Sequence, residues 1–176
     1  MVHAACLLDQ FTRVVRFRVR NLSAEEHLLL SRLHVVENLV LRQRLDSEGT
    51  AQSIRWYNLR ETLDGAVPKY ITSDCEFAPR HRADTSLGRL LECFTHWTYE
   101  YHGRQALLCG FRGVEWAITD VTIMDNTRDW FLQNPYTGGL QLFASTHVCG
   151  PMCGVIGLTQ QPPYYPVGPP PIQPEN

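Results

Sequence analysis

A cluster of histidine and cysteine near the C-terminal end of the chain constrains its fold more than any other feature. The cluster is His147-x-Cys149-x₃-Cys153, within A-S-T-H-V-C-G-P-M-C-G. Thiolate sulfur and imidazole nitrogen are the ligands of structural zinc sites, which take four of them in a tetrahedron. Cys149 and Cys153 are four residues apart, so one helical turn would bring both sulfurs to one side. His96, in F-T-H-W-T-Y-E, is the candidate for the fourth ligand.

The spacing alone leaves two interpretations of this cluster open. The four residues form a zinc site, or the cysteines are ordinary buried thiols, which pack as small apolar side chains, and the histidines lie on the surface. A zinc site would fit a zinc-stabilised interaction module or a nucleic-acid-binding finger. Against a finger stand the net charge of −2, the absence of a run of Lys and Arg, and the 51 residues that separate His96 from His147.

The composition is that of a globular protein in a reducing compartment. Apolar residues make up 44% and charged residues 19% of the 176 residues, enough for one or two small domains with a real core. The N-terminal apolar stretch is too short for a signal peptide, and no segment approaches the roughly 18 apolar residues of a membrane span. The six cysteines are therefore expected to be reduced or metal-bound. We expect an intracellular, cytoplasmic protein that binds neither membrane nor nucleic acid.

The N-terminal part, residues 1–54, is predicted to hold one strand and one long helix. Residues 12–20 alternate between apolar and basic side chains, as a half-buried strand does. The alternating residues are Val15, Phe17 and Val19 on one face and Arg16, Arg18 and Arg20 on the other. Ser23 and Glu26 form a capping box that begins a helix, predicted to run to about Arg44. Its apolar stripe is Leu29, Leu33, Val36 and Val40.

The central part, residues 55–159, is predicted to mix strands and helices, so the fold class is α+β. Strands are expected at I-R-W-Y-N-L from Ser53 and at V-P-K-Y-I after a turn at 64–65, with a polar loop over 73–86. A helix over 87–99 would turn Leu90, Leu91 and Phe94 toward a core. The remaining elements expected are strands over 105–111 and 116–120, a loop over 134–139 and a short helix through Leu142 and Phe143.

The C-terminal segment, residues 160–176, differs from the rest in composition. Seven of the eleven prolines lie in Q-P-P-Y-Y-P-V-G-P-P-P-I-Q-P-E-N. Such a segment favours polyproline II or disorder. Pro162, Pro163 and Tyr165 fit the P-P-x-Y pattern that WW domains bind. Binding would cost little ordering entropy, because a polyproline II ligand is already extended before it docks. The alternative is a disordered tail with a chance match.

Over roughly residues 55–158 the chain resembles the C-terminal part of the alpha-kinases, the atypical serine/threonine protein kinases. The resemblance rests on F-T-H-W-T-Y-E-Y, G-V-x-W-x-I-T-D, N-P-x-x-G-G and T-H-V-C-G-P-M-C-G-V-I-G-L, in this order. It implies a protein-kinase-like catalytic lobe, ATP and Mg²⁺ as cofactors, and a protein substrate. It also implies that His96, His147, Cys149 and Cys153 are structural zinc ligands. The stretch from Glu61 to Tyr70 resembles the hinge and linker between the two kinase lobes.

The chain departs from the family at the positions that carry the chemistry. Where members have Asp-x-Gln-Gly-Val, with a catalytic Asp and a magnesium-binding Gln, this chain has Gly110 and Arg112. The acid of the family's Thr-Asp pair is kept as Asp120. The Gly-x-Ala-x-x-Gly loop is kept only in part: Asn134 and Tyr136 replace its first Gly and its Ala, and Gly139 remains.

The lysine that pairs with the nucleotide phosphates in the family has no counterpart. The single lysine of the chain, Lys69, falls in the linker. An arginine of residues 16–20 is the candidate substitute, although Lys and Arg differ in reach and shape. Arg112 would place a fixed positive charge where a divalent cation belongs, or would bind a phosphate in place of the metal.

Three functional hypotheses follow from these residues. The first is a catalytically impaired pseudokinase, stabilised by zinc, that acts by binding. The second is an active ATP-dependent serine/threonine kinase whose carboxylates, among Asp120, Asp125 and Asp129, are rearranged. The third is the zinc-stabilised interaction module. Loss of a general base alone reduces a rate by ~10²–10⁴, so three simultaneous losses favour the first.

Overall fold

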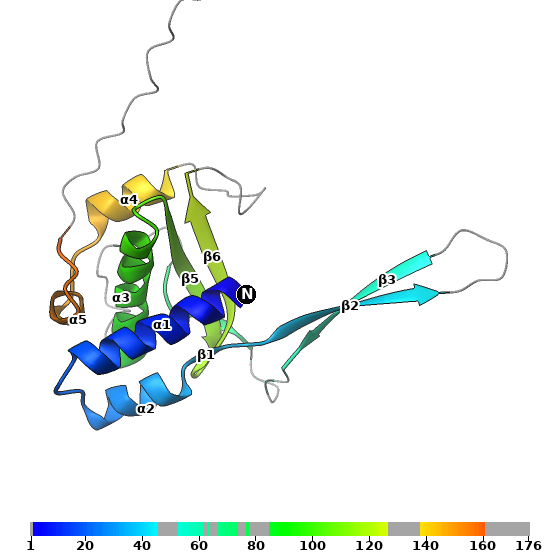
Figure 1. Ribbon diagram of the computed structural model, residues 1–176, viewed down its shortest axis with the longest axis horizontal. Helices are drawn as coiled ribbons and strands as arrows, with labels where there is room; N and C mark the ends of the chain where they lie inside the picture. The colour runs from blue at the N-terminus through cyan, green and yellow to red at the C-terminus, as the bar shows by residue number, and fades with distance from the viewer. Residues whose placement is uncertain are drawn as a thin grey trace, which may run out of the picture.

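Helix α3, Ser86–Tyr101, is the element on which the other parts of the fold pack. In the computed structural model one side of α3 lies on strand β5 (Ala106–Val114). Three helices contact its other sides (Figure 1): α1 (Val2–Arg18), α2 (Ala24–Arg32) and α5 (Pro151–Val155). The structure describes residues 2–45, 53–61, 63, 67–73, 77, 85–126 and 138–160. Thr85 caps α3, because its side-chain oxygen accepts a hydrogen bond from Gly88 N at 3.0 Å.

Among the described residues the strands form two separate sheets. The first has the order β1-β6-β5-β4, with β1 parallel to β6 and the other pairs antiparallel. Its strands are β1 (His34–Val35), β4 (Lys69–Tyr70), β5 (Ala106–Val114) and β6 (Ala117–Asp125). The second sheet is a two-stranded antiparallel ribbon of β2 (Asn38–Leu45) and β3 (Ser53–Arg60) that projects from the body (Figure 1). The α+β class predicted from the sequence is confirmed.

Helix α1, Val2–Arg18, occupies the place of the predicted strand over residues 12–20. Val15 is fully buried while Phe17 is 85% exposed, so the two do not share a face as an alternating strand requires. The buried residues of α1 recur at helical spacing: Ala4, Leu7, Leu8, Phe11 and Val15. The Phe11 ring lies 5.0 Å from that of Phe94 on α3. The strand prediction was wrong, and with it the idea that an arginine on such a strand replaces the family's lysine.

Helix α2, Ala24–Arg32, begins as predicted and ends far earlier. The capping box is confirmed: Glu26 N donates to Ser23 Oγ at 3.2 Å, and Ser23 N donates to a Glu26 carboxylate oxygen at 2.8 Å. The chain then leaves the helix for β1, where Val36 N donates to Ile118 O at 2.8 Å. The predicted continuation to Arg44 was wrong, because these residues pair with β6 and then form β2.

The remaining predicted elements of the central part are present. The helix over 87–99 corresponds to α3, and Leu90, Leu91 and Phe94 are buried in it. The two strands that follow are β5 and β6, and the short helix is α4, Gly139–Thr146. Helix α5, Pro151–Val155, is the last helix within the described residues. The predicted turns at 46–49 and 64–65, most of the loop over 73–86, residues 134–137 and the tail from 161 lie outside the described residues.

One buried cluster joins the N-terminal helices to the central part. It contains residues of α1 and α2 together with Leu91 and Phe94 of α3, Phe111 of β5 and Cys153 of α5. A second cluster, around Tyr99, Met124 and Phe143, lies under α4. The division of the chain at residue 54 stays a prediction. No helix within the described residues has the length and apolar character needed to cross a membrane.

Candidate functional site

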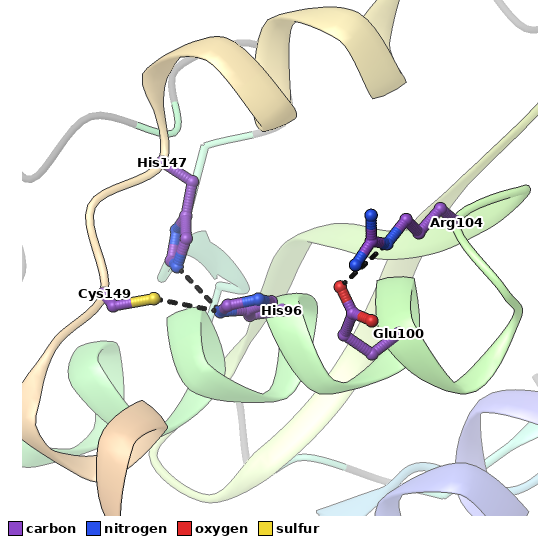
Figure 2. A network of polar contacts seen from close by, with 5 residues as sticks. All are labelled: His96, Glu100, Arg104, His147 and Cys149. Atoms are coloured by element: carbon purple, nitrogen blue, oxygen red, sulfur yellow. Dashed lines mark hydrogen bonds and ion pairs between the residues drawn. The ribbon is translucent and has the colours of Figure 1, made fainter. Parts of the chain in front are cut away.

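Four side chains meet at the end of the fold where α4 and α5 approach α3. Figure 2 shows the side chains of His147 and Cys149 directed at His96, and Cys153 completes the group. His147 Nε2 lies 3.1 Å and Cys149 Sγ 3.5 Å from His96 Nδ1. One ligand atom from each of the four residues lies within 4.8 Å of every other. The structure therefore brings together all four residues that the sequence singles out for a metal.

The geometry and chemistry of this group fit zinc. Zinc binds nitrogen at about 2.0 Å and sulfur at about 2.3 Å, so the edges of its tetrahedron measure roughly 3.3–3.8 Å. The two measured separations, 3.1 and 3.5 Å, are close to such edges. Two thiolates would neutralise the charge of the ion, and two neutral imidazoles would complete the ligand set. Because protein side chains fill all four positions, the site would be structural and would leave no position for a substrate.

Different elements hold the four ligands in place. His96 lies inside α3 and is fully buried. His147 ends α4, where its N–H donates to Phe143 O at 2.8 Å and its ring stacks on Phe143 with centroids 4.7 Å apart. Cys153 lies in α5, but Cys149 precedes that helix. The prediction that one helical turn presents both sulfurs was wrong, because Gly150 and Pro151 begin the helix only after Cys149.

The Gln160 side chain forms hydrogen bonds with the backbone of residues 147–149, which include two of the candidate ligands. Sequence analysis did not single it out. Its side-chain nitrogen donates to His147 O at 2.6 Å, and its side-chain oxygen accepts from Cys149 N at 3.0 Å. A single side chain thereby closes the loop that carries two ligands. Gln160 is the first residue of the C-terminal segment 160–176, whose proline-rich composition gave no sign of this contact.

Cys93 is a second residue that sequence analysis missed. It lies one turn before His96 on α3, is buried, and forms a hydrogen bond with Cys153. This bond, followed by hydrogen bonds from His147 and His96, holds the pKa of the Cys153 thiol well below its usual range against the opposing effect of burial. The same bond and burial raise the pKa of Cys93. Burial raises the pKa of Cys149 to about 11. The position of Cys93 three residues before His96 on a predicted helix is the signal that could have pointed to it.

Arg112 and Asp120 are register partners on the neighbouring strands β5 and β6, and neither is among the candidate zinc ligands. The Arg112 guanidinium lies over the Tyr70 ring, 4.7 Å from its centroid. Its Nε is buried and has no hydrogen-bond partner among the described residues. Thr119 Oγ1 lies 3.0 Å from an Asp120 carboxylate oxygen, to which it donates. The positively charged Arg112 and the carboxylate of Asp120 thus belong to residues directly opposite each other in the sheet.

Gly110 lies at an irregular point of β5. The register with β6 shifts between Cys109 and Arg112, and Gly110 has φ = +58°. Side chains other than those of Asn and Asp rarely adopt this left-handed conformation. Aspartate is one of the few residues that adopt this conformation, so φ alone does not account for the absence of the family's catalytic residue.

The other two residues taken from the family motifs have structural partners. Glu61 is exposed, and one of its carboxylate oxygens lies 3.4 Å from His34 Nε2. Gly139 is the first residue of α4 and packs against the Met124 side chain, so closely that a Cβ at position 139 would overlap the Met124 sulfur. Asn134 and Tyr136 lie outside the described residues. Close packing accounts for glycine at 139 without a ligand.

Comparison with known proteins places these observations in a family. The model of the alpha-kinase family matches residues 2–153. The chain is 28% identical to human alpha-protein kinase 3 over 113 residues, which is 62% of this chain and 7% of that protein. It is 27% identical over 111 residues to mouse transient receptor potential cation channel subfamily M member 6, covering 59% of this chain and 5% of the channel.

The fold is similar to that of solved alpha-kinase domains. The crystal structure of the alpha-kinase domain of myosin-II heavy chain kinase A in complex with AMP-PNP has a TM-score of 0.61 at 18% identity. It covers 91% of this chain and 54% of that one. A C-terminally truncated alpha-kinase domain of myosin heavy chain kinase gives the same TM-score and covers 56% of its length. The chain thus spans about half of these domains and a small part of the full-length relatives.

Proposed function

The chain belongs to the alpha-kinase family, and we propose on that premise that it is a zinc-stabilised pseudokinase. It acts by binding a protein, and its transfer of phosphate is slow or absent. We infer an intracellular location, where thiols stay reduced and free to hold a metal. The observation that carries the proposal is the pairing of Arg112 with Asp120 across β5 and β6.

Phosphoryl transfer needs three groups that these positions do not supply together. It requires a divalent cation on the phosphates, a fixed protein cation beside them, and a carboxylate that orients the attacking hydroxyl. By resemblance Gly110 stands at the place of that carboxylate, and it has no side chain. Lys69, the only lysine, is exposed on β4 and does not replace the family's phosphate-binding lysine.

Arg112 disfavours the binding of magnesium, because by resemblance it stands where family members have their magnesium-binding Gln. A guanidinium is always charged, and a second cation beside it meets direct repulsion. Asp120, the one family carboxylate that remains, lies opposite this cation and accepts a hydrogen bond from Thr119. The residues present therefore do not fit a magnesium ion. No transfer step through that ion follows from them.

The same arginine favours an anion. The Arg112 Nε is buried without a hydrogen-bond partner among the described residues, which leaves a charged donor for a phosphate oxygen. A nucleotide bound there would need no magnesium. Zinc would act at a different place, where His96, His147, Cys149 and Cys153 join α3 to the segment that follows α4. When bound, it supplies a cross-link and no reaction chemistry.

Nucleotide binding measured by thermal shift, with and without magnesium, tests this proposal. We expect ATP either to leave the melting temperature unchanged or to raise it equally in both conditions. Arg112→Gln should abolish any increase, and Arg20→Gln, an exposed arginine after α1, serves as the matched control. An increase that depends on magnesium, together with magnesium-dependent phosphorylation of a basic protein that Asp120→Ala abolishes, would support the active kinase with rearranged carboxylates instead.

A further inference from the structure

The ribbon of β2 and β3 has no partner strand among the described residues. Its eight register pairs run from Asn38 with Arg60 to Leu45 with Ser53, and the sheet ends at these two strands. Figure 1 shows it extending away from the helices and the four-stranded sheet. A two-stranded ribbon alone is marginally stable in water, and a third strand or a packed face is what stabilises it. Both edges offer backbone N–H and C=O groups to such a strand.

One face of the ribbon is apolar and exposed. Residues that pair directly share a face, and faces alternate along each strand. Leu39 pairs with Leu59 and Leu41 with Tyr57, so four apolar side chains form one strip. They are 42–58% exposed, with Leu39 the most exposed of them. Such a strip is larger than the single apolar side chains that a protein surface normally shows.

The ribbon carries positive charge and no negative charge. Residues 38–45 and 53–60 contain four arginines and neither Asp nor Glu. Arg42 lies on the opposite face from the apolar strip, over the exposed Trp56 ring at 5.7 Å. The whole chain has a net charge of −2, so this concentration of arginine is local. Arg60 shares the face of Arg42, together with the exposed Val40 and Trp56, whereas Arg55 lies on the face of the apolar strip. A partner strand with alternating apolar and acidic residues would match the strip on one face and Arg42 and Arg60 on the other.

We propose that the ribbon binds an extended, acidic segment of another protein, which adds to one edge as a third strand. Its apolar residues extend the strip of Leu39, Leu41, Tyr57 and Leu59, and its carboxylates lie beside the arginines. Main-chain hydrogen bonds provide affinity, and the alternation of side chains provides specificity. The inference rests on the proposed binding function, for which it names a surface and a class of partner.

The charge of the ribbon argues against a second copy of the chain. Two copies would bring eight arginines together with no acidic residue between them, and like charges at an interface weaken it. Single-stranded nucleic acid and an anionic membrane would also match the arginines. Neither uses the unpaired strand edges, so the peptide is favoured, and both enter the test as competing outcomes.

A labelled peptide tests the proposal directly on the zinc-loaded full chain. The probe is a nine-residue peptide in which glutamate alternates with valine and leucine, titrated by fluorescence anisotropy. Two matched probes have lysine in place of glutamate, or the same composition with all glutamates at one end. We expect the alternating acidic peptide to bind at least tenfold tighter than either. Hydrogen exchange should show slower exchange along one edge of residues 38–45 or 53–60.

Variants assign the binding to the ribbon. Arg42→Glu should weaken binding about fivefold or more, since it replaces attraction by repulsion, while Arg20→Glu, outside the ribbon, should change it little. Leu41→Thr with Leu59→Thr keeps strand propensity and removes the strip, and should weaken binding similarly. Reversal of Arg42, Arg55 and Arg60 to glutamate should transfer the preference to the lysine peptide. Circular dichroism and zinc content verify that each variant is folded.

The outcomes that overturn the proposal are distinct from those that overturn the pseudokinase assignment. Equal binding of the alternating and grouped peptides, or equal effects of Arg42→Glu and Arg20→Glu, would exclude strand addition at the ribbon. Tighter, Arg42-dependent binding of an oligothymidine or of phosphatidylserine vesicles would assign the ribbon to that ligand instead. None of these results depends on nucleotide binding or on phosphate transfer, which are measured separately.

Discussion

His96 Nδ1 and His147 Nε2 lie 3.1 Å apart although 51 residues separate them in the chain. The contact joins the interior of α3 to the end of α4, and it places both nitrogens where one metal ion would bind them. Fixing two such distant points by a metal removes much of the freedom of the unfolded chain between them. Zinc binding is thus expected to determine whether residues 147–153, which carry three of the candidate ligands, pack against α3.

Purified protein should contain one zinc per chain, and loss of a ligand should unfold it. A structural zinc of this kind contributes on the order of 10 kcal/mol, which exceeds the net stability of many small domains. We expect Cys153→Ser to be insoluble or to lack cooperative unfolding. Cys6→Ser, an exposed cysteine on α1, is the control and should behave as wild type. Metal analysis that finds well below one zinc per chain in a folded protein would contradict the site.

Gly139→Ala should destabilise the fold through Met124 and independently of any nucleotide. The added Cβ would overlap the buried Met124 sulfur, and overpacking of a core costs about 1–3 kcal/mol. Gly154→Ala, whose Cβ would meet nothing within 4 Å, is the control and should leave stability unchanged or slightly higher. Chemical denaturation of zinc-loaded protein measures both. If Gly139→Ala changed nucleotide binding without changing stability, position 139 would belong to a ligand site instead.

The capping box of α2 should contribute stability that is lost in acid. The Ser23 N–H, followed by its hydroxyl, hydrogen-bonds the Glu26 carboxylate and holds the pKa of Glu26 below 4.5. A lowered folded pKa means that this contribution is complete above pH 4.5 and disappears as the pH falls through the folded pKa. Carbon-13 NMR of the glutamate carboxyl groups should show Glu26 titrating below 4.5, and higher in Ser23→Ala. Because the backbone N–H of residue 23 remains in Ser23→Ala, identical titration in both proteins would show that the Ser23 hydroxyl does not hydrogen-bond Glu26.

The tail is predicted to bind WW domains through Pro162, Pro163 and Tyr165. A peptide of residues 159–171 should bind a panel of these domains, because its Tyr165 ring would fill one pocket of their aromatic groove. Tyr165→Ala should abolish that binding, and Tyr164→Ala, at the variable position of the motif, should keep it. Equal binding by the wild-type peptide and the Tyr165→Ala peptide would mean that the match arose by chance.

The sequence predicted the elements whose stability depends on local signals and on a strong periodicity. Ser23 and Glu26 indicated the start of α2, because both residues of the capping box lie within four positions of the sequence. Leu90, Leu91 and Phe94 indicated α3 because their spacing is that of the apolar face of a helix, and all three are buried. The candidate metal ligands were singled out because His147, Cys149 and Cys153 lie close together in the sequence, and the family resemblance, more than the spacing, favoured zinc over ordinary buried thiols.

The failures arose where a distant partner or a longer window decides the structure. Over residues 12–20 alternation looks like a strand, but the stripe from Ala4 through Phe11 to Val15 shows the helix once the window is extended. Leu33 to Val36 could continue α2 on propensity alone. They leave it because β6 offers hydrogen bonds from His34 and Val36 to Trp116 and Ile118, more than 80 residues away.

The site was incompletely predicted for a similar reason. Gln160 acts through two hydrogen bonds to the backbone of residues 147–149, and nothing in the sequence links them. The stacking of Arg112 on Tyr70 and its pairing with Asp120 depend on the register of β4, β5 and β6. The family resemblance identified Gly110 and Arg112 as the replaced residues. The register of the strands is what shows that Arg112 lies opposite Asp120.

Phosphate transfer from radiolabelled ATP to a basic protein, with magnesium, tests the central claim most directly. The wild type should give background, and Gly110→Asp with Arg112→Gln should rise measurably above it but stay slow, because the pair restores a carboxylate and removes the opposing cation while the family's phosphate-binding lysine remains absent. Gly110→Asn with Arg112→Gln is the matched control, since Asn tolerates the positive φ of position 110 but carries no charge, and it should remain at background. Robust magnesium-dependent transfer by the unmodified chain, abolished by Asp120→Ala, would contradict the account.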